Sequence, residues 1–358
     1  MKKKLVWIAS GGTGGHLYPA QSLAEKLIEP PHQIEVLFIG GGLSKNPYFD
    51  NNRFSYKQVA AAPFHGISFA TFSSCWQMVQ GFSESLHWMK QRPPTLIVGF
   101  GSYLAAPPLA AGCVTGVPIL LHEADSLLGR TNRWFAPFAR RVGVVFPQAG
   151  AALGKKAICT QMPLRKGYSL AEVSCKEAYA YFGFREDLET LMVIGGSQGA
   201  DICNQLAEYI QKPCQVLHLS GKKADPENIL AVYRKKGISA IVKPFETNMQ
   251  YAWRVADCWV GRSGSSTLAE ALAFEVPGLL IPYPYATGGH QELNARFFCE
   301  TVGGGLVLPE REISFALFNH HFETLWTDRL LRRAAIQEYK CHGSRTASAE
   351  IVCEVLGE

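Results

Sequence analysis

Two segments of the chain each combine an apolar run, a cluster of glycines and the start of a helical pattern. The first is LVWIASGGTGGHLYPA at residues 5–20, and the second is TLMVIGGSQGA at residues 190–200. The apolar run has the pattern of a buried strand. A helix that begins directly after the glycines directs free backbone N–H groups and the positive end of its dipole at one point. We expect both points to suit a phosphate group.

His16 closes the first glycine segment, in the run GGTGGH. An imidazole titrates near neutral pH, so at the rim of such a loop it could take a proton from an attacking hydroxyl group. The alternative is a histidine that only caps the loop or helix through a hydrogen bond. GGTGG departs from the dinucleotide fingerprint GxGxxG, and no acidic residue ends the next strand pattern, FIGGG, to hold a ribose. A nicotinamide cofactor is therefore disfavoured, and we expect no cofactor.

A third segment, VGRSGSSTLAE at residues 260–270, places hydroxyl groups where a strand pattern gives way to a helical one. Ser265, Ser266 and Thr267, together with free amides at the helix start, would form a seat for an anion. Glu270 follows, and one carboxylate can accept hydrogen bonds from both hydroxyls of a ribose. An acidic residue that merely stabilises the helix dipole is the alternative. Beside the hydroxyl cluster, Glu270 favours nucleotide binding.

The rest of the chain alternates strand and helix patterns in both halves. Its 358 residues suffice for two domains, and 47% hydrophobic with 18% charged residues is typical of a globular protein. The strand patterns cover residues 4–9, 35–39, 95–98, 117–121 and 142–146, and then 191–194, 215–219, 240–243, 258–261 and 278–281. This alternation predicts an α/β fold of two Rossmann-like lobes. The ligand would bind in an interdomain cleft, at the carboxyl ends of the strands.

The predicted domains are residues 1–162 with 342–358, and residues 163–341. Residues 160–165 form the first stretch without periodicity between the two sets of patterns, so we expect the hinge there. Residues 345–356 have the pattern of an amphipathic helix, with apolar residues near one face. A terminal helix of this kind can cross back to the first lobe.

The apolar segment at residues 96–121 carries no charge and is long enough to cross a bilayer. Seven glycines and prolines interrupt it, which favours a buried strand, helix and strand instead. The ten cysteines show no metal-binding spacing, so we expect buried reduced thiols and no metal site. The formal charge of +5 is only mildly basic and does not by itself choose among nucleotide, lipid and nucleic-acid partners.

Six segments together resemble the MurG family of peptidoglycan glycosyltransferases. In chain order they are GGTGGHLYPA, GFGSYLAAPPLAA, LHEADSLLGRTNRWFA, GGSQGA, GRSGSSTLAE and HQELNA. The resemblance implies the GT-B fold and a transfer of N-acetylglucosamine (GlcNAc) from UDP-GlcNAc to the C4 hydroxyl of the muramoyl sugar in lipid I. The product would be lipid II, formed with inversion. UDP-GlcNAc and lipid I are therefore the expected partners, and nucleic acid is not.

The resemblance also implies roles for single residues. His16 would be the catalytic base. The implied donor contacts are Thr13, Gly14, Gly15, Asp125, Arg165, Ser197, Glu246, Ser265, Ser266, Thr267, Leu268, Ala269, Glu270 and Gln291. Among them, the backbone at Glu246 would meet uracil, residues 265–269 the diphosphate, Glu270 the ribose and Gln291 the sugar.

The implied acceptor contacts are Gly101, Ser102 and Tyr103, which with the first glycine loop would receive the acceptor pyrophosphate. In this scheme the first domain faces the acceptor and the membrane, and the second binds UDP-GlcNAc. The sequence departs from the family pattern where HEQN reads HEAD, so that Asp125 replaces an asparagine. It departs again where GGY reads GSY. An aspartate can accept hydrogen bonds from sugar hydroxyls but cannot donate.

No DxD metal motif occurs in the chain, so we expect helix N-termini and hydroxyls to carry the leaving-group charge without an obligatory metal. Residues 69–89 predict an apolar helix surface that could reach a membrane. One face holds Phe72, Trp76, Val79 and Leu86, another holds Met78, Phe82 and Met89, and the basic residues nearby are Lys90, Arg92, Arg130, Arg133, Arg140 and Arg141. We expect peripheral binding at the cytoplasmic face of the cell membrane. The alternative is that both faces are buried in the first lobe.

Two other functions stay open at this point. One is another GT-B enzyme that uses UDP-GlcNAc, such as a 2-epimerase or a transferase with a soluble acceptor. The other is a non-catalytic nucleotide-sugar-binding protein, which Asp125 slightly favours.

Overall fold

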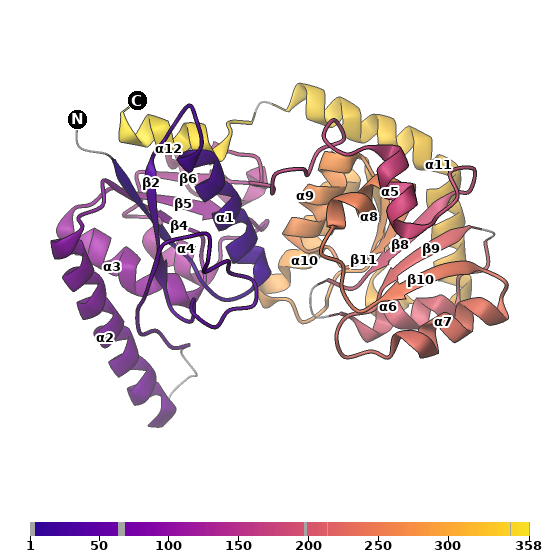
Figure 1. Cartoon of the computed structure of the whole chain (residues 1–358), viewed down its shortest axis with the longest axis horizontal. Helices are drawn as coiled ribbons and strands as arrows, with labels where there is room; N and C mark the ends of the chain where they lie inside the picture. The colour runs from indigo at the N-terminus through magenta and orange to yellow at the C-terminus, as the bar shows by residue number, and fades with distance from the viewer. Residues whose placement is uncertain (1–3, 64–68, 197–198, 213, 344, 358) are drawn as a thin grey trace. The chain divides into compact units, whose positions relative to one another are not determined.

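The computed structural model describes residues 4–63, 69–196, 199–212, 214–343 and 345–357. It divides into two compact units, residues 1–165 with 344–358, and residues 166–343. Each unit contains one parallel sheet with helices packed against it (Figure 1). The predicted α/β class with two Rossmann-like sheets is therefore confirmed.

The first sheet has seven strands in the order β3-β2-β1-β4-β5-β6-β7, all parallel. They are β1 Leu5–Ala9, β2 Glu35–Gly40, β3 Tyr56–Gln58, β4 Leu96–Gly99, β5 Ile119–Glu123, β6 Arg141–Val144 and β7 Ala157–Cys159. The sequence patterns predicted five of these within two residues at each end. They missed β3 and β7, because a three-residue strand at a sheet edge is too short to show a period.

Helices cover both faces of this sheet. The first unit contains α1 Gly14–Ile28, α2 Phe69–Gln91, α3 Ala106–Thr115, α4 Arg130–Phe135 and α12 Ser348–Leu356, with short turns η1 Tyr103–Ala105, η2 Pro147–Gly150 and η3 Gly154–Lys156. Successive residues of β1 point to opposite faces. Val6 and Ile8 pack with α1 and α12, whereas Trp7 packs with α3 and the end of α2.

The apolar segment at residues 96–121 forms β4, α3 and the start of β5. Its strands are fully buried, and Gly116 ends α3 with a φ of 73°. The prediction of a buried strand, helix and strand is confirmed. Across the described ranges, no helix is both long and apolar enough to cross a membrane.

The second sheet has six parallel strands in the order β10-β9-β8-β11-β12-β13. They are β8 Thr190–Ile194, β9 Gln215–Leu219, β10 Ser239–Lys243, β11 Cys258–Gly261, β12 Gly278–Leu280 and β13 Gly305–Val307. The helices are α5 Cys175–Phe182, α6 Asp201–Gln205, α7 Pro226–Lys235, α8 Met249–Val255, α9 Ser265–Phe274, α10 His290–Arg296 and α11 Phe315–His342, with short turns η4 Leu206–Glu208, η5 Thr287–Gly289, η6 Phe297–Thr301 and η7 Glu310–Glu312. The patterns predicted every strand here except the edge strand β13.

Strand order reverses beside the first strand of each sheet. β1 lies between β2 and β4, and β8 lies between β9 and β11. At such a point the loops that follow two adjacent strands leave in opposite directions and open a crevice for a ligand. The loops after β1 and β4 therefore come together in the first unit, as do those after β8 and β11 in the second.

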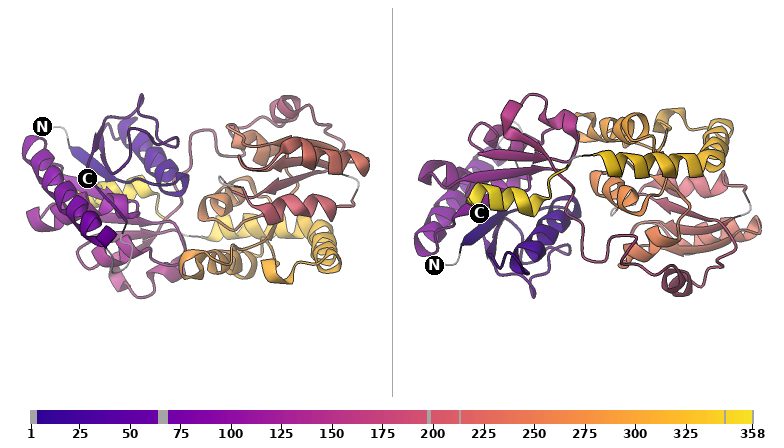
Figure 2. Two further views of the ribbon diagram at one scale, coloured as in Figure 1. Left: turned by 90° about the horizontal axis from the view of Figure 1, so that it is seen from below. Right: turned by 90° about the horizontal axis from the view of Figure 1, so that it is seen from above.

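The C-terminal helix α12 belongs to the first unit (Figure 2). Ile351 and Val352 are buried against α1 and the sheet. Thr160 Oγ1 lies 2.9 Å from Ser348 Oγ, and Thr346 N donates to Cys159 O at 3.1 Å. The last residues of the chain thus complete the core that the first residues begin.

Candidate functional site

The loop after β1 has the geometry of an anion-binding loop. β1 ends at Ala9 and α1 begins at Gly14, with Thr13 in the capping position and no acidic residue in the first turn. The first N–H groups of a helix have no partner within that helix, and here they follow a glycine turn in which Gly12 has a φ of 87°. Thr13 and Gly15 are exposed, so a ligand can reach this end of α1.

The loop after β4 brings Gly101 next to His16. Gly101 has a φ of 81°, and a Cβ added there would lie 3.4 Å from His16 Cε1 and 3.6 Å from Asn132 Nδ2. Ser102 Oγ lies 3.2 Å from the corresponding point on Gly12. The structure therefore unites the predicted base with the predicted acceptor loop, and it adds Asn132 from α4. The sequence analysis missed Asn132 because nothing in its spacing separates it from the other polar residues of LLGRTNRW.

Ser102 adopts a backbone conformation that suits glycine. Its φ is 65° and its ψ is 144°, a region in which a side chain is strained. Its Oγ accepts a hydrogen bond from Leu104 N at 3.4 Å, at the start of η1. The chain thus keeps the loop geometry that a glycine would give, although GSY replaces GGY.

Glu123 ends β5 and is buried, with 5% of its surface exposed. Burial and the Asp125 carboxylate raise its pKa to about 7, although hydrogen bonds from Gly129, Asn132 and Asp125 oppose the shift. The neighbouring His122 is also buried, and this burial lowers its pKa to about 3, so its ring is neutral. Asp125, a predicted donor contact, thus lies beside a buried carboxyl group in the first unit.

Arg165, another predicted donor contact, stacks on α1. Its guanidinium carbon lies 4.7 Å from the centre of the Tyr18 ring. A cation over an aromatic face is attracted by the ring's electrons, so Tyr18 fixes the arginine close to the first turns of α1. Within the first unit, the guanidinium thus adds positive charge near the glycine loop.

In the second unit, the loop after β11 leads into α9, which begins at Ser265. Ser265 is buried, and Ser266 Oγ is buried with no hydrogen-bond partner among the described residues. Leu268 and Ala269 turn their side chains into the core, and Leu268 N donates to Gly264 O at 3.0 Å. Residues 265–267 therefore place hydroxyls and N–H groups in the first turn of α9, whereas the side chains of Leu268 and Ala269 carry no polar group.

Glu270 is oriented by a buried tryptophan. Trp253 Nε1, on α8, donates to Glu270 Oε2 at 2.6 Å, and Trp253 is 1% exposed. A carboxylate has about four acceptor positions on two oxygens, so this bond leaves capacity for ribose hydroxyls. Glu270 lies in the second turn of α9, close to the hydroxyl cluster.

The side chain of Glu246 is buried, so only its backbone could meet a base. Its carboxylate accepts from Lys243 Nζ at 2.5 Å, from Asn248 N at 2.8 Å and from the Tyr181 hydroxyl at 3.0 Å. Burial opposes ionisation, but these bonds outweigh it and lower the pKa of Glu246. The carboxylate thus holds the loop after β10 in one conformation.

Gln291 is the second residue of α10 and is fixed by two contacts. Its Oε1 accepts from Tyr283 N at 3.0 Å, and its backbone oxygen accepts from Ser263 Oγ at 2.7 Å. The side-chain Nε2 is a donor that suits sugar hydroxyls. Ser263 belongs to the loop between β11 and α9, so its hydrogen bond to Gln291 O connects the start of α10 to that loop.

The loop after β8 is a poorer phosphate site than predicted. α6 has only five residues and carries Asp201 in its first turn, where a negative charge repels an anion. A Cβ on Gly199 would lie 2.7 Å from Ser220 O, so this glycine serves close packing against the next loop. Ser197, a predicted nucleotide contact, lies outside the described residues.

Two family models match the chain. The glycosyltransferase family 28 N-terminal domain matches residues 6–144, and the family 28 C-terminal domain matches residues 190–337. A protein from Protochlamydia amoebophila (strain UWE25) is 40% identical, over 99% of this chain and 96% of that protein. The chain belongs to glycosyltransferase family 28.

The Protochlamydia protein is named UDP-N-acetylglucosamine–N-acetylmuramyl-(pentapeptide) pyrophosphoryl-undecaprenol N-acetylglucosamine transferase. A protein of the same name from Chlamydia muridarum is 35% identical, over 88% of each chain. Among solved structures, MurG of Acinetobacter baumannii has a TM-score of 0.78 at 22% identity, covering 99% of this chain and all of that one. A transferase from Siraitia grosvenorii has a TM-score of 0.69 at 15% identity, with the same coverage. The resemblance to the MurG family and the GT-B fold are thus confirmed.

Only part of the predicted apolar surface on α2 of this family 28 chain is exposed. Trp76 and Val79 are 70% and 59% exposed. Phe82, Leu86 and Met89, however, pack against the core beneath the sheet. The prediction of two apolar faces along the whole helix is therefore wrong for its second half, where α3 and the sheet cover α2. The side chain of Phe72 lies outside the described residues.

A second set of exposed apolar side chains lies on and just after α4. The sequence analysis did not identify this set. Trp134 and Phe138 are 61% and 65% exposed, and the predicted basic residues Arg130, Arg133 and Arg140 are exposed beside them in the sequence. Aromatic side chains interleaved with arginines are typical of surfaces that meet a membrane interface.

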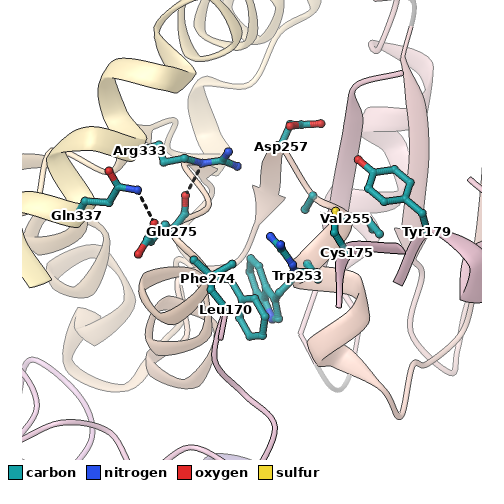
Figure 3. A pocket seen from close by; sticks show the side chains of 12 residues that line it. Leu170, Cys175, Tyr179, Trp253, Val255, Asp257, Phe274, Glu275, Arg333 and Gln337 are labelled. Atoms are coloured by element: carbon teal, nitrogen blue, oxygen red, sulfur yellow. Dashed lines mark hydrogen bonds between the residues drawn. The ribbon is translucent and has the colours of Figure 1, made fainter. Parts of the chain in front are cut away.

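Apart from these loops, the second unit of the family 28 chain contains a cavity of about 260 Å³ (Figure 3). Its lining includes Trp253, Asp257, Glu275, Arg333 and Gln337. Asp257 immediately precedes β11, so the cavity lies at the amino end of that strand, opposite the loops that carry the predicted donor contacts. None of the predicted site residues lines it.

The structure contains no candidate metal centre among the described residues, where no three His, Cys, Asp or Glu side chains converge. All ten cysteines are free. Only three of them, Cys203, Cys214 and Cys258, are buried, so the expectation of buried thiols holds for a minority. Burial raises the pKa of the first two to about 12, which keeps them unreactive thiols.

Proposed function

We infer that this chain transfers GlcNAc from UDP-GlcNAc to the C4 hydroxyl of the muramoyl sugar in lipid I, with inversion, to form lipid II for peptidoglycan. The observation that carries this inference is the 40% identity, over almost the full length of both chains, to a transferase named for these substrates. Both matching family models are of glycosyltransferases, which supports a transferase over an epimerase or a non-catalytic binding protein.

On the donor side, we propose that residues 265–267 hold the diphosphate through their hydroxyls and the N–H groups that begin α9. Glu270 would accept hydrogen bonds from the ribose, in the orientation that Trp253 gives it. The backbone at Glu246 would meet uracil. Support for these roles comes from the hydroxyl groups gathered at the start of α9 and from the hydrogen bonds that hold the loop after β10.

Other donor contacts would complete the site. Gln291 would donate to the sugar, and Arg165 would add positive charge. The remaining proposed contacts are Thr13, Gly14, Gly15, Asp125 and Ser197. The acceptor pyrophosphate would bind the N–H groups of the loop at residues 101–103 together with those at the start of α1, because both loops leave the same switch point of the first sheet.

We propose His16 as the base. The C4 hydroxyl of the acceptor attacks the anomeric carbon from the face opposite UDP, and His16 takes its proton as the bond to the diphosphate oxygen breaks. The negative charge that develops on UDP is stabilised by the start of α9. The position of His16 beside Gly101 supports this role, since it places the imidazole next to the proposed acceptor loop.

We propose that the enzyme acts as a peripheral protein at the cytoplasmic face of the cell membrane. Its acceptor is a lipid, so the acceptor loop must come within reach of a bilayer. The exposed apolar residues Trp76, Val79, Trp134 and Phe138 and the arginines around α4 support this placement.

The test is transfer of radiolabelled GlcNAc from UDP-GlcNAc to a lipid I analogue. Wild type should form the labelled disaccharide product, and His16→Ala should lose at least about a hundredfold in kcat, the usual effect of removing a general base. His320→Ala, an exposed histidine on α11, is the matched control and should retain full activity. Equal rates in wild type and His16→Ala would remove His16 as the base, and no product from wild type would contradict the transferase.

A further inference from the structure

Glu123 is held at the carboxyl end of β5 by three N–H donors. Oε1 accepts from Asp125 N at 3.1 Å, and Oε2 accepts from Gly129 N at 2.8 Å and from Asn132 Nδ2 at 2.9 Å. A carboxyl group that only accepts has the geometry of its ionised form. One buried side chain therefore fastens the loop at residues 124–129 and α4 to the end of the strand.

Asn132 carries this anchor to the proposed acceptor site. It is 2% exposed, and its Nδ2 also donates to His122 O at 3.0 Å. The same amide and the His16 ring approach Gly101 within 3.6 and 3.4 Å of the point where a Cβ would stand. Moving the Asn132 amide would therefore change the surroundings of Gly101 in the acceptor loop, at the point that the His16 ring also approaches.

Two buried polar atoms in this cluster have no hydrogen-bond partner within the described part of the chain. They are Asn132 Oδ1 and His122 Nε2. A buried amide oxygen without a donor is unfavourable by about 1–3 kcal/mol, so such atoms are normally satisfied by water or by a ligand. Because Glu123 and His122 O occupy Nδ2, the Oδ1 atom is left for a hydroxyl or N–H group of a bound substrate.

We propose that Glu123 is a positioning residue of the transfer site: its carboxylate holds Asn132 beside Gly101 and His16, and the adjacent Asp125 sets the pH range in which this arrangement persists. The inference rests on the proposed function, since it assigns the acceptor side of that site. It gives a role to Asp125, the residue that replaces the family's asparagine.

Titration of Glu123 would release the anchor. Burial and Asp125 raise the pKa of Glu123 to about 7, well above the ordinary value of 4.5. As the pH falls through this value the carboxyl gains a proton, and one of its oxygens changes from acceptor to donor. The N–H bonds to that oxygen then weaken, and the Asn132 amide keeps its bond to His122 O but is held less firmly by Glu123.

The other charged and titratable groups near Glu123 do not remove the influence of Asp125. His122 is neutral because of its burial, and His16 on α1 lies beyond Gly101. On α4, Arg130 and Arg133 are exposed. The flanking strands β4 and β6 contribute only Arg141, which pairs with Leu120, three residues before Glu123. Replacing Asp125 by asparagine removes the like charge and should lower the pH at which Glu123 titrates.

The first test is a carboxyl titration by NMR on protein labelled with ¹³C at the side-chain carboxyls of glutamate. Glu123→Gln identifies the Glu123 signal by its disappearance. In wild type this signal should titrate near pH 7, and in Asp125→Asn it should move down by at least about half a unit. A signal that titrates in the ordinary range near 4.5, or that does not move in Asp125→Asn, would overturn the proposal.

The second test follows transfer to the lipid I analogue from pH 5.5 to 9, with UDP-GlcNAc saturating. In Asp125→Asn the acidic limb of kcat/KM for the acceptor, which protonation of the proposed base His16 also shapes, should shift to lower pH by no more than the NMR signal does. In Glu123→Gln, kcat/KM for the acceptor should fall about tenfold or more while KM for UDP-GlcNAc stays close to wild type. Glu186→Gln, an exposed residue of the second unit with the same charge change, should leave the profile unmoved.

These tests separate the two ways of failing. If the Glu123 signal behaves as expected but wild type transfers no GlcNAc at any pH, the proposed function fails while the anchor stands. If wild type transfers GlcNAc but Asp125→Asn leaves the acidic limb in place, the positioning role fails and the function stands.

Discussion

At the scale of single residues, the two carboxylates next to the proposed ligands are held in different ways. Glu123 is buried among backbone and amide N–H groups, which makes its ionisation sensitive to a neighbouring charge. Glu270 is half-buried and accepts a hydrogen bond from the indole N–H of Trp253, which orients its carboxylate. The arrangement of Glu123 suits a residue that fixes the positions of other residues, and that of Glu270 suits a residue that binds a ligand.

Trp253→Phe should weaken donor binding by removing the bond that orients Glu270. Hydrogen bonds to charged groups contribute about 1.5–3 kcal/mol, and Glu270 will recover part of this through water, so we expect KM for UDP-GlcNAc to rise roughly three- to tenfold. Initial rates at varied UDP-GlcNAc measure this. Trp326→Phe is the matched control, because buried Trp326 makes the same kind of bond to Glu189, far from α9 in the sequence. An equal rise in KM in both variants would contradict the role of Trp253.

Ser102→Gly should stabilise the first unit. A glycine adopts a φ of 65° without strain, so the free energy of unfolding should rise by about 1 kcal/mol despite the greater freedom of the unfolded chain. Urea unfolding followed by fluorescence measures the change. Ser102→Ala keeps the strain and loses the bond to Leu104 N, so it should be less stable than wild type. If Ser102→Gly were less stable than wild type, the backbone at this position would not be strained.

At the scale of elements, helices far apart in the sequence share one core. α12 closes the face of the first sheet that α1 also covers, so the chain end is a structural part of the first unit. α2 divides into a second half packed on the core and an earlier part in which Trp76 and Val79 are exposed. A helix with one face in the core and one apolar part in solvent is available for a further contact.

Ile351→Ala should destabilise the first unit. The side chain is 1% exposed between α1 and the sheet, and a buried Ile→Ala change costs about 2–5 kcal/mol. Urea unfolding of the full chain measures the loss. Glu354→Ala on the outer face of α12 removes only a surface ion pair with Arg141 and should cost less than about 1 kcal/mol. A loss for Ile351→Ala as small as for the control would mean that α12 is not part of the core.

Replacing Trp76 and Val79 by serine should weaken binding to vesicles. Burying a large apolar side chain in a bilayer interface contributes about 1.5–3 kcal/mol, so the double variant should lose at least about tenfold in partitioning to anionic phospholipid vesicles. Sedimentation with sucrose-loaded vesicles measures this. Leu330→Ser removes a similarly exposed apolar residue from α11 of the second unit and should bind as wild type does. Unchanged binding of the double variant would exclude α2 from the membrane contact.

At the scale of the whole molecule, two sheets of the same design carry different ligand groups. The first unit provides glycine loops, His16 and buried polar side chains, and the second provides the hydroxyl-rich start of α9 with Glu270. Each set lies where the strand order of its sheet reverses. In the proposed function the diphosphate and ribose contacts on α9 belong to the second unit, so variants of these residues should change KM for UDP-GlcNAc and leave KM for the acceptor close to wild type.

Transfer should not require a metal ion. The chain has no DxD motif, and hydroxyls with helix N–H groups can stabilise a diphosphate. We expect the rate of lipid II formation after dialysis against EDTA to stay within about twofold of the untreated enzyme. If EDTA abolished activity and added Mg²⁺ restored it, transfer would require a metal ion. A rate that added Mg²⁺ leaves unchanged supports transfer without one.

The sequence by itself determined the α/β class, most strands and the residue types of the proposed site, because buried parallel strands are continuous apolar runs and glycine loops stand at their ends. It could not place three-residue edge strands, nor show that the second half of α2 is covered, since these depend on packing partners distant in the chain. Only the tertiary structure brought Asn132, Glu123 and Asp125 to Gly101 and His16. They come from separate segments that adjacent parallel strands carry to one edge of a sheet, and no local pattern records that meeting.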